Sequence, residues 1–372
     1  MKVIVLSQAL HPQYGGSAVS EASLCAQLQQ RCETVVLCRA GAYDDAFGRS
    51  FGLTHVREVT PLEVFRAWIQ PSHPLHALLD GVDLVHLNGH WCWEWIAFTR
   101  LAHRRGIPFL MHPRGMLWLG HRKVWLKRIF NFVLGRWAIT HASRVIALSA
   151  FEKQQWTPYA LAEPRCVVIP NGVTACAESP GERPYALPYF LYLGRIESRK
   201  NLVFLVRAFH RYVRTGGNAD LLLIGPAERG YDVRVADEID RLGLRGRARL
   251  LAPEYGDRKQ AYLRHALAVV YPSVGEPFGR VPFETLAAGG MPLVPRESGS
   301  AEYLESFLPE SIYPMQDHDA LAARFRALEG LDRRNLSGWV AARGWVAKDL
   351  DWTKITDQVE AVYKGVVAEA HA

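Results

Sequence analysis

Short apolar runs alternate with longer amphipathic stretches through the first half of the chain. The stretch after the first run, Ala18–Gln30, carries apolar residues at helical spacing, and stretches long enough for helices separate most of the other runs. Strands that alternate with helices indicate a parallel sheet covered on both faces. The runs predicted as strands are Lys2–Leu6, Thr34–Cys38, Val82–Leu87, Phe109–His112, Arg144–Leu148 and Cys166–Pro170.

The alternation restarts after residues 171–188, whose three prolines and two glycines are typical of a linker. The sequence therefore predicts an α/β chain of two doubly wound domains, 1–178 and 179–350, whose ligands bind in a cleft at the carboxyl ends of the strands. Residues 351–372 are predicted as a helix that packs back on the first domain. Strands of the second domain are predicted at Tyr189–Leu193, Asp220–Ile224, Arg249–Leu251, Ala268–Tyr271 and Met291–Val294, and helices at Leu202–Arg214, Tyr231–Leu242, Lys259–His265 and Val281–Ala288.

Composition excludes several classes of protein. The chain has 372 residues, of which 49% are hydrophobic and 22% charged, so it is neither disordered nor collagenous. No apolar run reaches the roughly 18–20 residues that span a bilayer, and the N-terminal run is too short for a signal peptide. The six cysteines are scattered without a CxxC pair, which favours reduced thiols and a cytoplasmic location.

Positive charge is concentrated in the first half of the chain. The net charge is +7, yet no carboxylate occurs in the 57 residues from 95 to 151, which hold ten lysines and arginines. Nucleic acid, an anionic membrane surface or an acidic substrate are the partners that such a region predicts.

A glycine pair follows the first strand. Gly15 and Gly16 precede Ser17 and the first predicted helix, where glycine lets the backbone approach a phosphate and the helix N-terminus offers free N–H groups. A plain turn is the alternative. The dinucleotide fingerprint G-x-G-x-x-G is absent, and the second strand leads to Arg39 rather than to an acid, which disfavours a nicotinamide dehydrogenase.

Cations and carboxylates recur at strand ends in the second half. Arg195 and Lys200 follow the strand 189–193 and have the chemistry to hold phosphate oxygens. Glu276 lies in a loop after a strand, and Glu284 lies in an apolar helix, where a carboxylate is costly without donors such as sugar or ribose hydroxyls. A solvated basic turn and acids paired within the fold are the alternatives.

The first half also offers residues suited to a glycan acceptor. His112 and Arg114 lie at the carboxyl end of the strand 109–112, on the cleft side. The segment 88–95 contains His90, Trp91 and Trp93, and tryptophan faces stack on sugars. Rings packed into the core are the alternative.

Together these residues resemble family 4 of the retaining glycosyltransferases, over roughly residues 1–365. The resemblance implies the GT-B fold, which consists of two Rossmann-like domains. The segment FLMHPRGML at 109–117 is also similar to members that build bacterial surface polysaccharides. The motifs that carry the resemblance come in the family's order: Gly15-Gly16, PNGV at 170–173, GRIESRKN at 194–201, PS at 272–273, Glu276 with Glu284, and AAGGMPLV at 287–294.

The resemblance also implies roles for single residues. The Gly15–Gly16 pair would bind the donor pyrophosphate, and Arg195 and Lys200 would neutralise it as it leaves. Glu284 would accept from the ribose hydroxyls, and His112 would contact the transferred sugar near its reacting carbon. Glu276 would hold sugar hydroxyls with the loop that follows it, namely Pro277, Phe278, Gly279 and Arg280; Pro277 stands where the family usually has glycine. Neither a metal nor a cofactor is implied.

The implied activity is metal-independent transfer of a hexose, with retention, from a UDP- or GDP-linked sugar to a glycan acceptor bound by His90, Trp91, Trp93 and Arg114. Such an enzyme would serve O-antigen, capsule or exopolysaccharide synthesis. A nucleotide-sugar epimerase of the same fold and a non-catalytic nucleic-acid-binding protein are the alternatives. No nucleic-acid-binding motif supports the latter.

The segment 117–137 combines basic and large apolar residues. Helical spacing places near one face Trp118, Val124 or Trp125, Ile129, and Phe132 or Val133, with Arg122, Lys123 and Lys127 away from it. A basic amphipathic helix can lie in an anionic bilayer interface, and an ordinary helix packed on the sheet is the alternative. We expect a peripheral enzyme at the cytoplasmic face of the inner membrane, acting on a polyprenyl-diphosphate-linked sugar.

Overall fold

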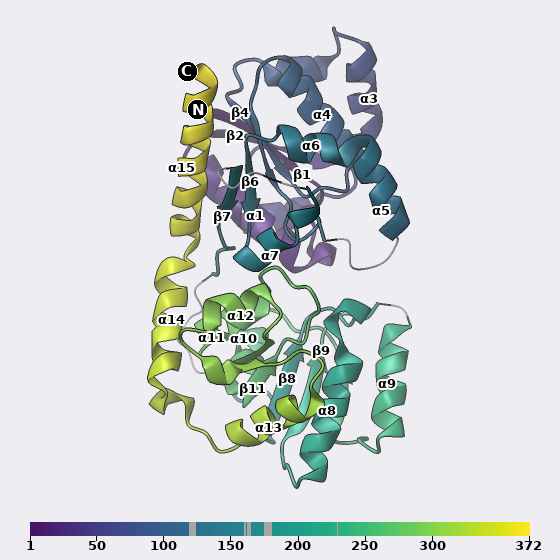
Figure 1. Cartoon of the computed structure of the whole chain (residues 1–372), viewed down its shortest axis with the longest axis vertical. Coiled ribbons are helices and arrows are strands. Elements are labelled where there is room, and N and C mark those ends of the chain that lie inside the picture. Colours follow the sequence, from purple (N-terminus) through teal and green to yellow (C-terminus); the bar gives the residue numbers. More distant parts are fainter. Residues whose placement is uncertain (119–123, 160, 162–164, 175–180, 229) are drawn as a thin grey trace. The chain divides into compact units, whose positions relative to one another are not determined.

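The computed structural model describes residues 1–118, 124–159, 161, 165–174, 181–228 and 230–372 (Figure 1). The chain divides into two compact units. The first consists of Met1–Gly172 together with Trp352–Ala372, and the second is Val173–Asp351. Part of the predicted linker, residues 175–180 with Cys176, lies outside the described residues. Cys25, Cys32, Cys38 and Cys92 are free thiols within the described part of the chain.

The first unit is built on a seven-stranded sheet with the order β3-β2-β1-β4-β5-β6-β7, and every pair is parallel. All six predicted strands are present, and the order reverses between β1 and β4. Sequence reasoning missed β3, a four-residue edge strand in which Arg57 and Glu58 interrupt the apolar pattern. The strands are β1 (Lys2–Ser7), β2 (Glu33–Arg39), β3 (Val56–Val59), β4 (Leu84–Asn88), β5 (Phe109–His112), β6 (Arg144–Ala147) and β7 (Cys166–Val168).

Helices follow most of these strands. The first helix begins two residues earlier than predicted, at Gly16, because Gly15 adopts a left-handed φ of 64° and serves as its N-cap. The helices are α1 (Gly16–Gln29), α2 (Asp45–Ser50), α3 (Pro61–Ile69), α4 (Trp93–Arg104), α5 (Val124–Phe130), the π-helical turn η3 (Asn131–Gly135), α6 (Arg136–His141), α7 (Ala150–Gln154) and α15 (Trp352–His371).

A single core joins the sheet of the first unit to α3, α4 and α6. Val64 and Ala67 of α3, Trp95 of α4 and Ile139 of α6 are buried in it. The indole of Trp95 donates a 2.9 Å hydrogen bond to the carbonyl of Ser7, which ties α4 to the end of β1. These three helices therefore cover the same face of the sheet.

The C-terminal helix α15 completes the first unit. It packs against α1, and the hydroxyl of Tyr363 lies 2.5 Å from Nδ1 of His86 on β4. Arg31, just beyond α1, forms ion pairs with Asp357 and Glu360 of α15. The twenty-residue helix α15 therefore folds against residues that lie more than 270 positions earlier in the sequence.

The second unit holds a six-stranded parallel sheet with the order β10-β9-β8-β11-β12-β13. The five predicted strands are present, and the two-residue strand β13 (Ile312–Tyr313) was missed. The strands are β8 (Tyr189–Leu193), β9 (Asp220–Ile224), β10 (Ala248–Leu251), β11 (Ala268–Val270), β12 (Pro292–Pro295) and β13. The helices are α8 (Leu202–Arg214), α9 (Tyr231–Arg241), α10 (Gly256–His265), α11 (Arg280–Ala288), α12 (Gly299–Leu304), α13 (His318–Leu328) and α14 (Ser337–Asp349).

Candidate functional site

In the first unit the candidate residues gather at the carboxyl ends of β1, β4 and β5. Gln8 follows β1, Asn88 is the last residue of β4, and His112 is the last residue of β5. Because the sheet order reverses between β1 and β4, this edge is the switch point at which open α/β sheets bind ligands. The N-terminus of α1, with Gly15 and Gly16, follows the same end of β1.

Arg114 links the segments at this edge. Its φ of 52° is left-handed, a conformation that costs about 1–3 kcal/mol for a residue other than glycine. That backbone is held by Gly115, whose N–H donates to Glu152 at 2.6 Å. The Arg114 guanidinium donates to the side-chain oxygens of Asn88 at 3.0 Å and of Asn171 at 2.8 Å. The predicted acceptor-site arginine is thus a rigid, largely buried cation.

Glu21 of α1 is a second charged group here, and sequence reasoning missed it. Its side chain is buried, which raises the pKa of its carboxyl to about 7, although Arg114 and the hydroxyl of Ser7 act in the opposite direction. The available signal was a lone charge among the mostly small and apolar residues of α1. A carboxyl with this pKa titrates near neutral pH.

His112 is buried and neutral. Burial is the main cause that holds the pKa of its imidazole well below 6.5, and Arg114 and His86 act in the same direction. Its ring stacks on His86, with centroids 5.7 Å apart and an interplanar angle of 11°. Neither ring nitrogen has a hydrogen-bond partner among the described residues. His112 can therefore give or take a hydrogen bond without bringing a charge.

Other polar atoms at this edge are also unsatisfied. Nε2 of Gln8, Nδ2 of Asn88 and one terminal guanidinium nitrogen of Arg114 are buried and have no hydrogen-bond partner within the described ranges. Each such group costs about 1–3 kcal/mol unless a ligand or water satisfies it. Donors beside a carboxylate and a neutral imidazole suit a ligand whose hydroxyls both donate and accept.

The other predicted acceptor residues differ in their availability. His90 is buried, and its Nε2 lies 2.6 Å from the side-chain oxygen of Asn131. Its ring packs edge-on against Trp91 and Phe130, and burial lowers the pKa of its imidazole to about 4. His90 and Trp91 thus pack together locally, whereas Trp93 at the start of α4 is exposed.

In the second unit Lys200 and Glu276 form a buried pair. The ammonium of Lys200 lies 2.8 Å from Oε2 of Glu276 and donates to the hydroxyl of Tyr271, also at 2.8 Å. Burial opposes the charge of Glu276, but Lys200 and Arg199 offset it, so the pKa of this carboxyl lies below its usual value. The pair joins the β8–α8 loop to the loop after β11.

Glu284 on α11 is held by two cations. Its Oε2 accepts from the ammonium of Lys259 at 2.7 Å, and its Oε1 pairs with Arg280 at 2.8 Å. Burial opposes its charge, yet Arg280 and Lys259 keep the pKa of this carboxyl below its usual value. Sequence reasoning missed Lys259, because nothing in the spacing of α10 shows that it faces α11.

The remaining predicted donor residues of the second unit lie in the loop after β8 and around the start of α11. Arg195 is half-exposed at the end of β8, 3.6 Å from Glu197. Phe278 is buried against Phe283, with ring centroids 4.4 Å apart. Gly279 has a φ of 70°, and a Cβ there would meet Oγ of Ser300 at 2.8 Å, so only glycine fits. Pro277 lies two residues before Gly279, and Arg280 is the first residue of α11.

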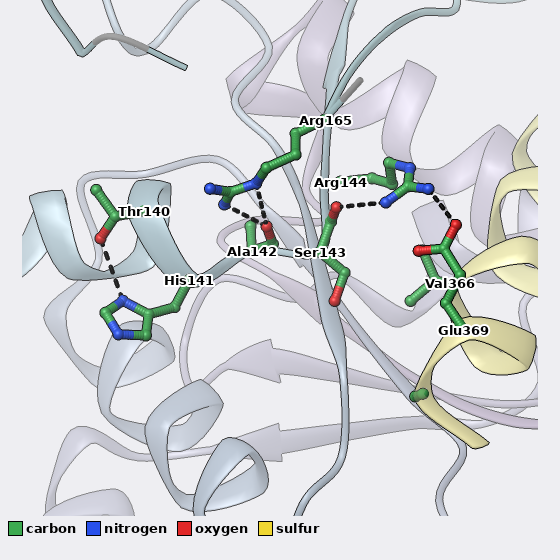
Figure 2. Close-up of a pocket in the computed structure, with 9 residues that line it drawn as sticks. Thr140, His141, Ala142, Ser143, Arg144, Arg165, Val366 and Glu369 are labelled. Atoms are coloured by element: carbon green, nitrogen blue, oxygen red, sulfur yellow. Dashed lines mark hydrogen bonds and ion pairs between the residues drawn. The ribbon is translucent and has the colours of Figure 1, made fainter. Parts of the chain in front are cut away.

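A pocket of about 420 Å³ lies away from these residues (Figure 2). Ser143 and Arg144, which line it, lie at the amino end of β6, whereas His112 lies at the carboxyl end of β5, on the opposite edge of the sheet. Its guanidinium groups are already engaged, Arg144 by Glu369 and Arg165 by the carbonyl of Ala142. Of the described residues, no three His, Cys, Asp or Glu side chains are grouped as a metal site.

Two family models match the chain. The model described as Glycosyltransferase Family 4 matches residues 14–175, and the one described as Glycosyl transferases group 1 matches residues 181–336. The chain is a family 4, group 1 glycosyltransferase. The family predicted from the motifs is therefore confirmed.

Curated relatives of this glycosyltransferase are distant. An uncharacterized glycosyltransferase of Methanocaldococcus jannaschii is 30% identical over 47% of this chain and 44% of its own length, so the chain spans less than half of that relative. A D-inositol 3-phosphate glycosyltransferase of Nocardiopsis dassonvillei is 24% identical over 78% and 72% of the two chains. An alpha-maltose-1-phosphate synthase of Mycobacterium tuberculosis is 24% identical over 99% and 100%.

Solved structures establish the fold of this glycosyltransferase. Anabaena HepE in complex with UDP gives a TM-score of 0.78 at 18% identity, covering 98% of this chain and 100% of that one. A sucrose-phosphate synthase of Thermosynechococcus elongatus gives 0.77 at 17% identity, covering 99% and 100%. The α/β fold of two Rossmann-like units, GT-B, is confirmed.

We predict that Lys200→Met lowers the free energy of unfolding by about 3 kcal/mol, because it leaves the buried carboxylate of Glu276 without its cation. The double variant K200M/E276Q should recover much of that loss, since it also removes the carboxylate charge. Chemical unfolding followed by circular dichroism measures both. The exposed Lys348→Met serves as the control, and K200M as stable as that control would contradict the pairing.

Proposed function

We propose that this glycosyltransferase moves a hexose from a UDP- or GDP-linked sugar to a glycan acceptor, with retention and without a divalent metal. The observation that carries the proposal is the pairing of two buried acids, Glu276 and Glu284, with Lys200, Lys259 and Arg280 in the second unit. An ionised carboxylate accepts hydrogen bonds from sugar and ribose hydroxyls, and the lysines and the arginine can bind the oxygens of a diphosphate. The UDP in the HepE structure supports this class of donor.

The chemistry rests on charge stabilisation. As the bond between the sugar's anomeric carbon and the phosphate oxygen breaks, Arg195 and Lys200 neutralise the charge that develops on the diphosphate. The acceptor hydroxyl attacks from the same face, and its proton passes to the leaving phosphate oxygen. His112 takes part as a neutral hydrogen-bonding group at the sugar, because burial keeps its imidazole uncharged.

The acceptor is proposed to bind in the first unit, at the edge that holds Arg114, Glu21 and Asn88, with Trp93 exposed nearby in sequence. The hydroxyls of a sugar can accept hydrogen bonds from the unsatisfied donors at this edge and can donate to the carboxyl and the neutral imidazole. The names of two relatives, D-inositol 3-phosphate glycosyltransferase and alpha-maltose-1-phosphate synthase, point instead to small phosphorylated molecules. A surface feature of the first unit favours a lipid-linked glycan over these.

That feature is the outward side of α5 and η3. Phe132 is 88% exposed and Trp125 64%, and Ile129 and Val133 are also exposed. Their positions share one side of a helix. The apolar face of this segment is therefore open rather than packed on the sheet, although residues 119–123 of the predicted amphipathic stretch lie outside the described residues.

An open apolar face next to Arg128 and Arg136 suits an anionic bilayer. We accordingly place the enzyme at the cytoplasmic face of the inner membrane, where it extends a polyprenyl-diphosphate-linked glycan in O-antigen, capsule or exopolysaccharide synthesis. No helix in the described ranges is long and apolar enough to cross a membrane.

A nucleoside diphosphate should raise the melting temperature. At a hundred times its Kd, UDP or GDP adds about 2.7 kcal/mol by mass action, or roughly 2–4 °C for a chain of this size. Glu284→Ala should abolish the shift, whereas the surface variant Glu305→Ala should keep it. Differential scanning fluorimetry with UDP, GDP, ADP, TDP and CMP makes the comparison. If none of the five raises the melting temperature of the wild type, the donor assignment is contradicted.

The product should keep the anomeric configuration of the donor sugar, since leaving and attack take place on one face of the ring. Incubation with the nucleotide sugar and a synthetic lipid-linked acceptor, followed by NMR of the new anomeric proton, reads the configuration. An inverted centre would overturn the mechanism. Conversion of the donor without any acceptor would favour an epimerase instead.

Flotation with vesicles tests the membrane. Wild type should float with vesicles that contain phosphatidylglycerol and much less with phosphatidylcholine alone. Because each large apolar side chain adds about 1.5–3 kcal/mol on burial, W125S/F132S should bind at least tenfold more weakly. V233S/V340S, at exposed positions of the second unit, is the matched control. Equal flotation with both lipids would contradict the proposal that the enzyme binds an anionic membrane.

A further inference from the structure

Helix α3 carries an exposed apolar stripe that the catalytic proposal does not use. Leu62, Phe65 and Ile69 are 53%, 52% and 62% exposed, and their spacing of three and four residues places them along one side of the helix. Val64 and Ala67 on the opposite side are buried in the core of the first unit.

The helix that presents this stripe is firmly built. Thr60 and Glu63 form a complete capping box, in which the Glu63 side chain accepts from the Thr60 N–H at 2.7 Å and the Thr60 hydroxyl accepts from the Glu63 N–H at 3.2 Å. Pro61 at the first helical position adds a preset φ. The stripe is therefore a preformed surface, so a partner would not have to order it.

Contacts join α3 to α4, and through α4 to η3, α5 and α6; these five elements are called the helical layer below. Both α3 and η3 pack against α4. The guanidinium of Arg104 on α4 lies 4.1 Å from the ring centroid of Trp68 on α3, and that of Arg100 lies 4.7 Å from Trp137 on α6. Figure 1 shows α3, α4, α5 and α6 gathered in the first unit. The outward side of α4 thus connects the stripe of α3 to η3 and α6.

The charge of this layer is almost entirely positive. Its two carboxylates are committed, Glu63 in the capping box and Glu94 buried in an ion pair with Arg39 at 3.1 Å. Within the described ranges, five arginines of the layer form no ion pair with a carboxylate: Arg66, Arg100, Arg104, Arg128 and Arg136. Two apolar edges with arginines between them match the depth profile of an anionic bilayer, because arginine reaches phosphates while apolar and aromatic groups enter below them.

We propose that α3 is a second bilayer contact, so that the enzyme docks on anionic phospholipid through the outward surface of α3, α4 and η3. The stripe of Leu62, Phe65 and Ile69 enters the interface, and Arg100 and Arg104, stacked on tryptophan rings, hold lipid phosphates. The inference rests on the membrane part of the proposed function and deepens it, since two separated apolar contacts fix how the first unit is oriented on the membrane.

Vesicle partitioning of the full chain tests the apolar stripe. We expect L62Q/F65Q/I69Q to bind phosphatidylglycerol-containing vesicles at least tenfold more weakly than wild type. The matched control V233Q/L331Q/V340Q changes three exposed apolar residues of the second unit and should bind within about twofold of wild type. Hydrogen exchange of residues 61–69 in wild type should slow on vesicle addition, a readout that does not depend on any variant.

The arginines have their own arm. Each cation near an anionic surface contributes about 1 kcal/mol, so R100Q/R104Q should lower vesicle binding about thirtyfold. The reduction should be smaller at high salt, because salt screens the charges. R214Q/R234Q removes the same charge from exposed positions of the second unit and should have a far smaller effect. Loss of binding in R100Q/R104Q with none in the α3 variant would overturn insertion of the stripe.

The outcomes separate this inference from the proposed function. If wild type binds vesicles, but the α3 variant binds equally well and residues 61–69 exchange as before, the inference is wrong and the α5–η3 contact stands. If wild type binds no anionic vesicle, both membrane statements fail. Neither result affects the nucleotide-induced rise in melting temperature, which tests the donor site by itself.

Discussion

Parallel strand pairing is the constraint on which the rest of this structure depends. Parallel strands can be joined only by crossovers, so each strand ends at the same edge as its neighbours and delivers its last residues there. In the first unit this brings Asn88 and His112 to one edge with the N-terminus of α1. In the second unit it brings the loop with Lys200 to the loop with Glu276. Residues far apart in the sequence therefore meet without any local signal.

Burial at these edges decides the charge of each group. In the second unit every buried acid of the candidate site has a cation within hydrogen-bond distance, which keeps Glu276 and Glu284 ionised in spite of burial. In the first unit burial leaves His112 neutral and raises the pKa of Glu21 toward neutrality. The candidate site of the second unit thus consists of fixed charges, whereas that of the first unit consists mostly of neutral hydrogen-bonding groups beside Arg114.

Acids of the fold already engage Lys200, Lys259 and Arg280 in the second unit. Lys200 now holds Glu276 and Tyr271 in place, and a diphosphate would compete for the same ammonium. Under the proposed function, this pairing holds the ammonium in position before the donor binds, which is the condition for strong electrostatic stabilisation of developing charge. The partners of Glu284 act in the same way, since Lys259 and Arg280 fix the carboxylate from two helices.

The sequence by itself determined the fold class, nearly all strands and the family, because apolar periodicity and short motifs are local properties. It also singled out Lys200, Glu276 and Glu284 as candidate site residues, because they lie within recognisable motifs. Tertiary structure alone revealed that Lys259 faces Glu284, since a cation's partner depends on how two helices pack. It also decided which apolar stripes are covered: periodicity shows that Leu62, Phe65 and Ile69 share a face, but only packing shows that no other element of the described structure buries it.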